Sequence, residues 1–576
     1  MKQLVTIALV FSACLLEVNA ENWLFIDGKS QYTIVLPKAP SITERTATNE
    51  FQQIIKEISG VELPVTSDVS PSKGKHVYIG FCRATALSEA NCPDDDDEGY
   101  YYYTKGNDLF IYGGRNRGTM NGVYAFLERE LGVHWYTSAF TKIPKRKNYA
   151  LRHLYHHEAP TIRQRLDFYY DALTHDDWAA HNLLNTQYLL SDSKYGRMTA
   201  HWGIHTFHTL LPPADYFNQH PEYFSLYKGS RSVDAQLCLS NNDMRRELTK
   251  RLKESIAKNP GYWCYDVSQN DNGYPCECPD CQRLVKRYGG QSGAMIWFVN
   301  QVANDIKKDY PNVLIGTFAY WYTRQAPTSN ICPVDNVVIR LCDIECCMAH
   351  PLEKCEQNHS FLSDLNNWKR IAKNICVWDY TTGFSNYMLP FPNFDVLSDN
   401  FRLFARYGVM GILEEGSHNA QWNEFSELKQ WMIAKLLWNP SQNTDSLARQ
   451  FIEDYYGKAA SIVWQYYQLC KKQITPNKHF TIAVDWQADI YSDKFIADGM
   501  SLMRKAYEIV GDDKEMAKRL NRLQAQILYL KLRRNTAASL FDGTLQTFID
   551  IIKADDTLIQ ENDYKLNDLL KDLEYH

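Results

Sequence analysis

The stretch NVVIRLCDIE, residues 336–345, decides the fold, because an apolar run typical of a buried strand ends there in two carboxylates. Three further stretches share this design, namely GYWCYDVSQND at 261–271, NICVWDY at 374–380 and GVMGILEE at 408–415. In a parallel (β/α) barrel the carboxyl ends of the strands meet at one mouth, so acids that recur at these ends are gathered there. The pattern therefore predicts a (β/α)8 barrel with an acidic mouth.

The acids at these strand ends are the candidate catalytic residues. Carboxylates can protonate a glycosidic oxygen or activate water, and aromatic faces stack on sugar rings. The combination favours carbohydrate chemistry, although exposed strand ends are also polar for no functional reason. The catalytic candidates are Asp271, Asp343, Asp379, Glu345, Glu414 and Glu415, and the aromatic candidates for substrate binding are Trp321, Trp378 and Tyr380.

Two more groups of polar residues are candidates for substrate binding. The segment HWGIHTFHTLLPP, residues 201–213, brings several imidazoles and an indole to one side of the expected barrel mouth. Two arginines on the first expected strand could bind a substrate carboxylate or pair with barrel acids. The candidates are His201, Trp202, His205, His208, Arg163 and Arg165.

Composition limits the classes of protein that the chain can represent. Its 576 residues exceed the size at which one core keeps growing, so two or three domains are expected. The sequence contains 37 Tyr, 25 Phe and 14 Trp, a surplus that sugar binding would use. The net charge of −6 and the lack of a basic stripe argue against nucleic acid as a partner.

The first residues have the features of an export signal. Lys2 precedes an apolar run, and Val18-Asn19-Ala20 places small residues where a signal peptidase cleaves. We therefore expect a signal peptide at 1–20, a mature protein from Glu21, and a location in the periplasm, at the cell surface or outside the cell. The alternative is a lipoprotein site that tethers the chain to a membrane through Cys14, and no later stretch is apolar enough to span a bilayer.

The cysteines are expected to have a structural role. The run CECPDC places Cys276, Cys278 and Cys281 within six residues. With a fourth sulfur from Cys264 or from the 342–347 group they could bind zinc, and in an oxidising compartment they could form disulfides, which is the interpretation that we favour over metal. No catalytic cofactor is expected.

Three regions follow the signal peptide. Residues 21–150 alternate strand-like and helix-like runs, which predicts a small α/β domain. Residues 155–460 contain the acid-tipped strands, the further strand candidates 161–168 and 185–190, and intervening helices, as a barrel requires. Residues 461–576 have amphipathic helical periodicity, which predicts a helical cap or a homodimer surface.

Several motifs resemble those of glycosidases. GGRNRGT at 113–119 and the NGVYAFLERELG that follows resemble the accessory domain of α-glucuronidases and β-hexosaminidases, and 419–457 looks like the last barrel helix of α-glucuronidases. A large group of exported bacterial proteins, which are predicted glycosidases, shares HPEYF at 220–224, SQND at 268–271, the CxCPxC motif and LLWNP at 436–440.

The resemblance implies an inverting mechanism with Asp271 as the acid and with Asp343 and Asp379 as the base positions. The family acid and second base are glutamates, so the shorter aspartates change the reach, and Glu345, Glu414 and Glu415 stay substitutes. The expected function is an exported glycoside hydrolase acting on a complex polysaccharide or glycan. The alternatives are a non-catalytic glycan-binding protein on the same scaffold and, less favoured, a zinc-dependent hydrolase.

Overall fold

A computed structural model describes residues 22–69, 74–87, 90–185, 194–196, 201–555 and 557–574. The described residues form two compact units, one within 22–132 and 143–158 and the other within 133–142 and 159–574. The expected signal peptide and Cys14 lie outside the described residues.

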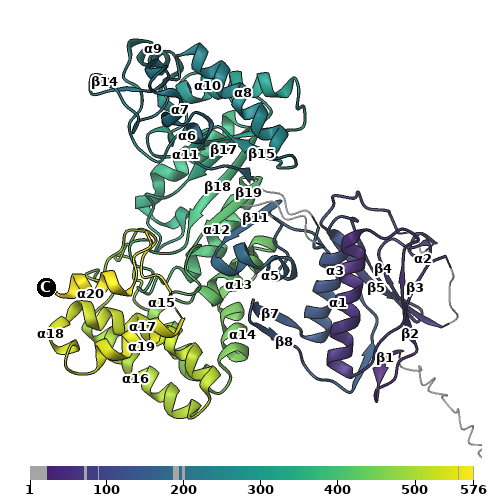
Figure 1. Cartoon of the computed structure of the whole chain (residues 1–576). Coiled ribbons are helices and arrows are strands. Elements are labelled where there is room, and N and C mark those ends of the chain that lie inside the picture. The colour runs from purple at the N-terminus through teal and green to yellow at the C-terminus, as the bar shows by residue number, and fades with distance from the viewer. Residues whose placement is uncertain are drawn as a thin grey trace, which may run out of the picture. The chain divides into compact units, whose positions relative to one another are not determined.

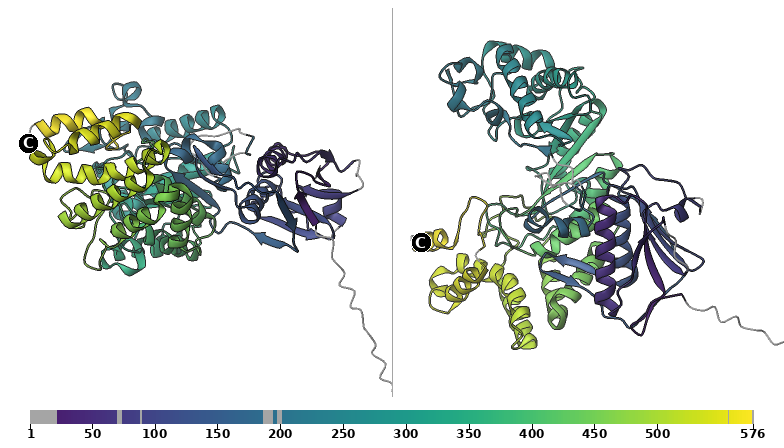
Figure 2. Two further views of the ribbon diagram at one scale, coloured as in Figure 1. Left: turned by 90° about the horizontal axis from the view of Figure 1, so that it is seen from below. Right: turned by 45° about the vertical axis from the view of Figure 1, so that its right-hand side comes forward.

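The first unit is built on a six-stranded mixed sheet in the order β10-β5-β6-β4-β2-β3. Two helices, α1 (Ile42–Ser59) and α3 (Gly118–Leu131), lie side by side on one face of this sheet (Figures 1 and 2). A short pair, β1 with β9, and the small helix α2 complete the unit. The bounds are β1 Asn22–Ile26, β2 Tyr32–Leu36, β3 Val65–Ser67, β4 Lys75–Ile79, β5 Tyr100–Lys105, β6 Asp108–Gly113, β9 Asn148–Leu151, β10 Tyr155–Glu158 and α2 Arg83–Leu87.

The glycines of the motif at 113–119 serve packing in this unit. A Cβ on Gly114 would lie 2.3 Å from the carbonyl oxygen of Asp97, and one on Gly118 would lie 2.5 Å from the same atom. The acidic loop at 94–98 therefore crosses directly over the turn that leads into α3, and only glycine leaves room for its backbone. The motif is structural here.

The second unit is built on a curled sheet of seven parallel strands in the order β11-β19-β18-β17-β16-β15-β12. The acid-tipped runs form four of these strands, although the first of them ends at Asp266, five residues before Asp271. The bounds are β11 Gln164–Phe168, β12 His201–Trp202, β15 Cys264–Asp266, β16 Leu314–Ala319, β17 Val337–Cys342, β18 Asn374–Tyr380 and β19 Gly411–Glu415. The strand candidate 185–190 lies, except for Asn185, outside the described residues, and the described strands form an open half-barrel.

Helices connect the strands and cover the sheet. Between β12 and β17 the chain makes a lobe of α6 to α10, at the top of Figure 1, and α11 and α12 follow β17 and β18. The hairpin of β7 and β8 belongs to this unit. The bounds are α4 Tyr170–Thr174, α5 Asp176–His181, α6 Phe207–Leu210, α7 Pro213–Tyr216, α8 Asn242–Lys258, α9 Pro279–Tyr288, α10 Gln291–Lys307, α11 His359–Ile371, α12 Phe394–Arg406, β7 His134–Thr137, β8 Phe140–Lys142, β13 Leu226–Tyr227 and β14 Ser230–Arg231.

The remaining helices follow the last strand. Every residue of α13 (Ser426–Trp438) is buried, so this helix is part of the core rather than an amphipathic cover. The helices α16, α17 and α19 pack side by side in the C-terminal region, coloured yellow in Figures 1 and 2. The bounds are α14 Thr444–Tyr456, α15 Ala460–Lys471, α16 Asp493–Val510, α17 Lys514–Arg534, α18 Thr536–Ser539, α19 Thr544–Asp555 and α20 Leu566–Glu574.

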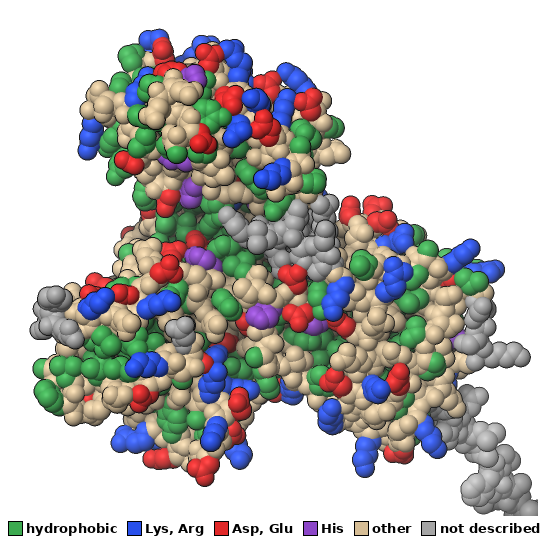
Figure 3. Space-filling view, in the orientation of Figure 1, with side chains coloured by type: hydrophobic (Ala, Val, Ile, Leu, Met, Phe, Trp, Pro, Cys, Tyr) green, Lys and Arg blue, Asp and Glu red, His purple; other side chains and the backbone are tan. Residues whose placement is uncertain are grey.

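The surface carries charges of both signs. Basic and acidic side chains are interspersed over the face shown in Figure 3. None of the helices in the described part of the chain combines the length and the apolar character that crossing a bilayer requires.

Candidate active site

A cavity of about 590 Å³ lies at the carboxyl ends of the parallel strands. This volume is within the range of small-molecule sites, which runs from roughly 300 to 1,000 Å³. Its wall is rich in aromatic side chains and holds three carboxylates. The lining residues are Phe168, Leu173, Ile204, His205, Asp271, Phe318, Tyr320, Cys342, Ile344, Trp378, Tyr380, Phe384, Glu415, His418, Ile482 and Glu561.

Strand alternation decides which acids reach this cavity. Trp378 and Tyr380 of β18 and Glu415 of β19 line the cavity. Asp379 lies between the first two, and Glu414 directly precedes Glu415, so both project from the opposite face of the sheet. Asp379 pairs in register with Glu414, and Glu414 with Asp167 of β11. These acids therefore form a buried row behind the sheet, facing the helices.

Among the expected catalytic residues, Glu415 lies on a strand and lines the cavity. Its Oε2 accepts a hydrogen bond of 2.8 Å from Nε1 of Trp378. Burial raises the pKa of Glu415 to about 8, with smaller contributions from the negative charges of Glu561 and Asp271, while the indole donor opposes the rise. The carboxyl group of Glu415 is therefore protonated at neutral pH, as a proton donor must be.

Asp271 reaches the same cavity from the loop that follows β15. The side chain is exposed, and its Oδ1 accepts a hydrogen bond of 3.0 Å from the hydroxyl group of Tyr320. Trp321, which is 42% exposed, stacks on Tyr320 with ring centroids 5.2 Å apart and adopts a left-handed backbone with φ of 50°. This aromatic pair beside a carboxylate offers a flat surface for a sugar ring.

The third carboxylate, Glu561, comes from the loop between α19 and α20. The sequence prediction missed it, because the residue lies in a helical region far from any strand end. Two hydrogen bonds hold the backbone of this loop: the Glu561 amide donates to the Phe384 carbonyl at 3.2 Å, and the side-chain Nδ2 of Asn419 donates to the Glu561 carbonyl at 2.7 Å. Burial, assisted by the charge of Asp271, raises the pKa of Glu561.

The other expected catalytic acids do not line the cavity. Burial is the main cause that raises the pKa of both Asp343 and Asp379. The negative charge of the nearby Asp379 raises the pKa of Asp343 further. Burial likewise raises the pKa of Glu414, which lies in the same row. Glu345 lies outside the cavity in an ion pair with Arg324, and its side chain is 47% exposed. These placements leave Asp271 and Glu415 as the expected acids that the structure brings together.

A buried ion pair lies inside the sheet. The guanidinium group of Arg340 on β17 bonds the carboxylate of Asp266 on β15, and both side chains are almost fully buried. The guanidinium carbon also lies 5.2 Å from the Phe318 ring centroid and 5.8 Å from that of Trp378. A Cβ at residue 316 would lie 2.2 Å from Asp266 Oδ1, so Gly316 makes room for the pair. The pair thus supports the indole that contacts Glu415.

The expected histidines have different positions. His205 lines the cavity, and its Nδ1 donates to the Gln269 carbonyl at 2.7 Å, which leaves Nε2 as an acceptor. Trp202 and His201 form the edge strand β12, where His201 packs edge-on against Trp263 at 4.4 Å between centroids. His208 is partly buried away from the cavity wall, and burial lowers its pKa. His418, which the sequence did not indicate, joins the lining.

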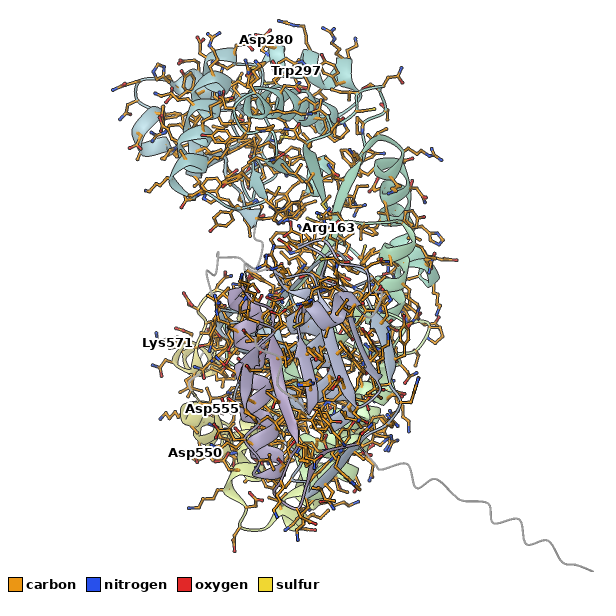
Figure 4. All side chains as sticks on the ribbon, turned by 90° about the vertical axis from the view of Figure 1, so that its right-hand side faces the viewer. Arg163, Asp280, Trp297, Asp550, Asp555 and Lys571 are labelled. Atoms are coloured by element: carbon orange, nitrogen blue, oxygen red, sulfur yellow. The ribbon has the colours of Figure 1, made fainter. Side chains whose placement is uncertain are left out.

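The two arginines lie at the other end of β11. Arg163, labelled in Figure 4, is exposed and precedes the first residue of that strand, whereas Phe168 at its last residue reaches the cavity. Arg165 is fully buried and donates to the Leu183 carbonyl at 3.0 Å and to the Ile162 carbonyl at 2.9 Å. The structure therefore gives Arg165 a packing role and places both residues away from the cavity.

The cysteine motif does gather four sulfur atoms, but the fourth differs from the expectation. Cys238, which precedes α8, joins Cys276, Cys278 and Cys281, and their sulfur atoms all lie within 4.8 Å of one another. Cys264 instead lies on β15 inside the sheet, in contact with Cys376. The sequence could not single out Cys238, because 38 residues separate it from Cys276 and it has no neighbouring cysteine.

Comparison with known proteins identifies the family of this chain. The chain belongs to the family described as Domain of unknown function (DUF4838), whose model matches residues 135–468. No curated protein matches the sequence.

A solved structure of a glycoside hydrolase shares the fold. A family GH115 4-O-methyl-α-glucuronidase, BtGH115A, with specificity for decorated arabinogalactans, superposes with a TM-score of 0.59 at 10% identity, over 91% of this chain and 76% of that one. Two further structures give a TM-score of 0.44 each. One is a GH138 enzyme that targets pectin rhamnogalacturonan II, at 10% identity over 94% of this chain and 98% of that one. The other is CpGH84B, at 11% identity over 94% of this chain and 96% of that one. At 10% identity the likeness to BtGH115A extends to the fold alone.

Proposed function

We propose that this protein is a glycoside hydrolase that uses Glu415 as its proton donor. The observation that supports the proposal is the convergence of Glu415, Asp271 and Glu561 on one aromatic cavity at the carboxyl ends of parallel strands. Strand ends are where barrel enzymes place their chemistry, and paired carboxylates are what glycoside hydrolysis requires.

The environments of the carboxylates suggest separate roles. Glu415 carries a proton at neutral pH and can donate it to the departing glycosidic oxygen. Asp271, on the loop after β15, is the second carboxylate, which holds the attacking water if the reaction inverts. Oxygen atoms of Glu561 and Glu415 lie within 4.8 Å, closer than the roughly 6.5–9.5 Å of an inverting pair. We assign Glu561 to sustaining the protonation of Glu415, because its negative charge raises the pKa of that carboxyl group.

The cavity favours a neutral sugar at the cleavage site. The negative charges of Asp271 and Glu561 would repel the carboxylate of a uronic acid, whereas hydroxyl groups can donate hydrogen bonds to oxygen atoms of all three acids in the cavity. The aromatic rings around Trp378 and Tyr320 supply stacking surfaces. A glucuronide, the substrate class that the sequence resemblance suggested, is for this reason not our first choice.

A screen of glycans tests the proposal. Purified protein is incubated with neutral and uronic-acid-containing polysaccharides, and new reducing ends are measured, with Glu415→Gln as the matched control. We expect release from a neutral glycan, reduced about 10²- to 10⁴-fold in the variant. Equal release by both proteins would contradict the role of Glu415. Saturable binding of a glycan without cleavage would instead favour a glycan-binding protein.

Several expectations from the sequence stay predictions. They are export through residues 1–20, a lipid anchor at Cys14, closure of the sheet to a (β/α)8 barrel and a homodimer through the C-terminal helices. Phe541, which is 90% exposed after α18, is a side chain that such a dimer surface could cover.

A further inference from the structure

A second group of side chains of the types that can bind a metal ion lies close to residues of the cavity wall. Cys347, His350 and Cys355 belong to the loop between β17 and α11, and His479 belongs to the linker between α15 and α16. Nδ1 of His479 lies 3.3 Å from Sγ of Cys347 and 3.6 Å from Sγ of Cys355, and Nδ1 of His350 lies 3.5 Å from Sγ of Cys347. Their four ligand atoms all lie within 4.8 Å of one another.

These distances are those of a tetrahedral zinc site. Zinc bonds sulfur at about 2.3 Å and nitrogen at about 2.0–2.1 Å, which places sulfur and nitrogen ligands of one tetrahedron roughly 3.5 Å apart. The two thiolates also balance the double charge of the ion. We propose that Cys347, His350, Cys355 and His479 bind one structural zinc ion.

The surroundings of two ligands are already arranged for this role. Nε2 of His350 donates to the Thr475 carbonyl at 3.1 Å, so its Nδ1 carries the lone pair that a metal needs. Asn358 fixes the backbone of Cys347, accepting from its amide at 2.7 Å and donating to its carbonyl at 3.0 Å. The ligand orientation therefore does not depend on the ion alone.

Such an ion would hold one wall of the cavity together. The Phe480 carbonyl, next to His479, accepts from the Met348 amide at 2.8 Å, and the Ile482 carbonyl accepts from the Phe384 amide at 3.2 Å. Ile482 and Phe384 both line the cavity, as does Ile344 at the start of the ligand-bearing loop. If the proposed function is right, the site thus joins the C-terminal linker to the active-site wall across 124 residues of sequence.

The four-cysteine cluster independently supports a second zinc site. Sγ of Cys238 lies 3.7 Å from that of Cys278 and 3.8 Å from that of Cys281, and zinc–sulfur bonds of about 2.3 Å place tetrahedral sulfur atoms roughly 3.8 Å apart. Backbone amides point at two of the sulfurs, from Leu226 to Cys276 at 3.3 Å and from Cys281 to Cys278 at 3.4 Å. Four sulfur ligands leave zinc no open position, so this site is structural too.

Elemental analysis of the full-length protein tests both sites. We expect two zinc ions per chain in the wild type, one in His479→Asn, one in Cys278→Ser and none in the double variant. Cys332→Ser, at an exposed cysteine outside both groups, is the control and should keep two. A wild type with no zinc, or a His479→Asn variant that keeps two ions, would overturn the proposal for the His479 site.

Spectroscopy and thiol counting on the wild-type protein test the sites even if the variants fail to fold. Wild-type protein depleted of zinc by a chelator is titrated with Co²⁺, and we expect intense tetrahedral bands after two equivalents. Thiols are then counted in denatured protein with chelator and without reductant. Disulfides among the cluster cysteines would remove them from the count and contradict the zinc sites.

Enzyme activity is a separate readout. Loss of zinc from the His479 site should lower kcat/KM for any glycan that the protein cleaves, because Ile482 and Phe384 lose their support. The metal count does not depend on that activity, so failure of the proposed function and failure of the zinc sites are distinguishable.

Discussion

At the scale of single residues, the pKa of Glu415 controls the proposed chemistry. Because this pKa is about 8 and the protonated form donates the proton, kcat/KM should fall as the pH rises through about 8. Glu561→Gln removes a negative charge and should move this alkaline limb to lower pH. Trp378→Phe removes the donor that stabilises the carboxylate and should move it to higher pH.

The test is a set of pH–rate profiles of kcat/KM for the three proteins. Opposite shifts in the two variants are the expected result, and they do not depend on how much activity each variant retains. An alkaline limb that stays in place in both variants would mean that Glu415 is not the titrating group.

The face of the sheet on which each acid lies could not be predicted from the sequence. The sequence placed Asp379, Glu414 and Glu415 at strand ends correctly, whereas Asp271 lies five residues beyond the end of β15. Side chains also alternate between the faces of a strand, so neighbouring acids project to opposite sides of the sheet. In ILEE the first glutamate is buried behind the sheet and the second lines the cavity. The sequence alone does not show which of the two lines the cavity, because the register of the strand decides it.

At the scale of elements, α13 is anchored by a buried charge pair at its first turn. Nζ of Lys429 bonds the carboxylate of Glu424 and donates to the Thr381 carbonyl at 3.0 Å and the Phe391 carbonyl at 2.7 Å. All three hydrogens of the ammonium group are thus used. The contacts join α13 to the loop after β18, which also supplies Phe384 to the cavity.

Lys429→Met should therefore lower the free energy of unfolding by about 3–5 kcal/mol, because it leaves Glu424 buried without its partner. The double variant Lys429→Met/Glu424→Gln removes both charges and should be less destabilised than the single variant. Urea unfolding followed by circular dichroism measures the difference. A single variant as stable as the wild type would show that the pair does not anchor the helix.

The main elements themselves were largely predictable. Apolar runs bounded by polar residues indicated β17, β18 and β19, and the 3.6-residue periodicity indicated α10, α12 and α17. The short edge strand β12 was missed as a strand, because two residues, His201 and Trp202, give no periodicity. Element prediction thus succeeded where local pattern and tertiary burial agree.

At the scale of the whole molecule, segments distant in sequence contribute to the cavity and to the two proposed zinc sites. Glu561 and His479 come from the C-terminal region, where neither periodicity nor spacing distinguishes them from surface residues. Cys238 joins a cluster that lies 38 residues further along the chain. Such partners are set by tertiary packing, and the pattern of residues in a single sequence does not indicate them.

The loop that carries Glu561 should therefore be a determinant of activity although it lies far from any strand. Asn419 holds this loop through its 2.7 Å hydrogen bond to the Glu561 carbonyl, and its own Oδ1 accepts from the Tyr387 hydroxyl at 3.0 Å. Asn419→Ala should release Glu561 from Glu415. We expect kcat/KM to fall about three- to tenfold, the worth of roughly one hydrogen bond, and the alkaline limb to move to lower pH by less than in Glu561→Gln.

Asn366→Ala, at an exposed position on α11, is the control and should change neither quantity. A loss of activity in Asn419→Ala without any shift of the limb would mean that Asn419 supports the fold and does not position Glu561.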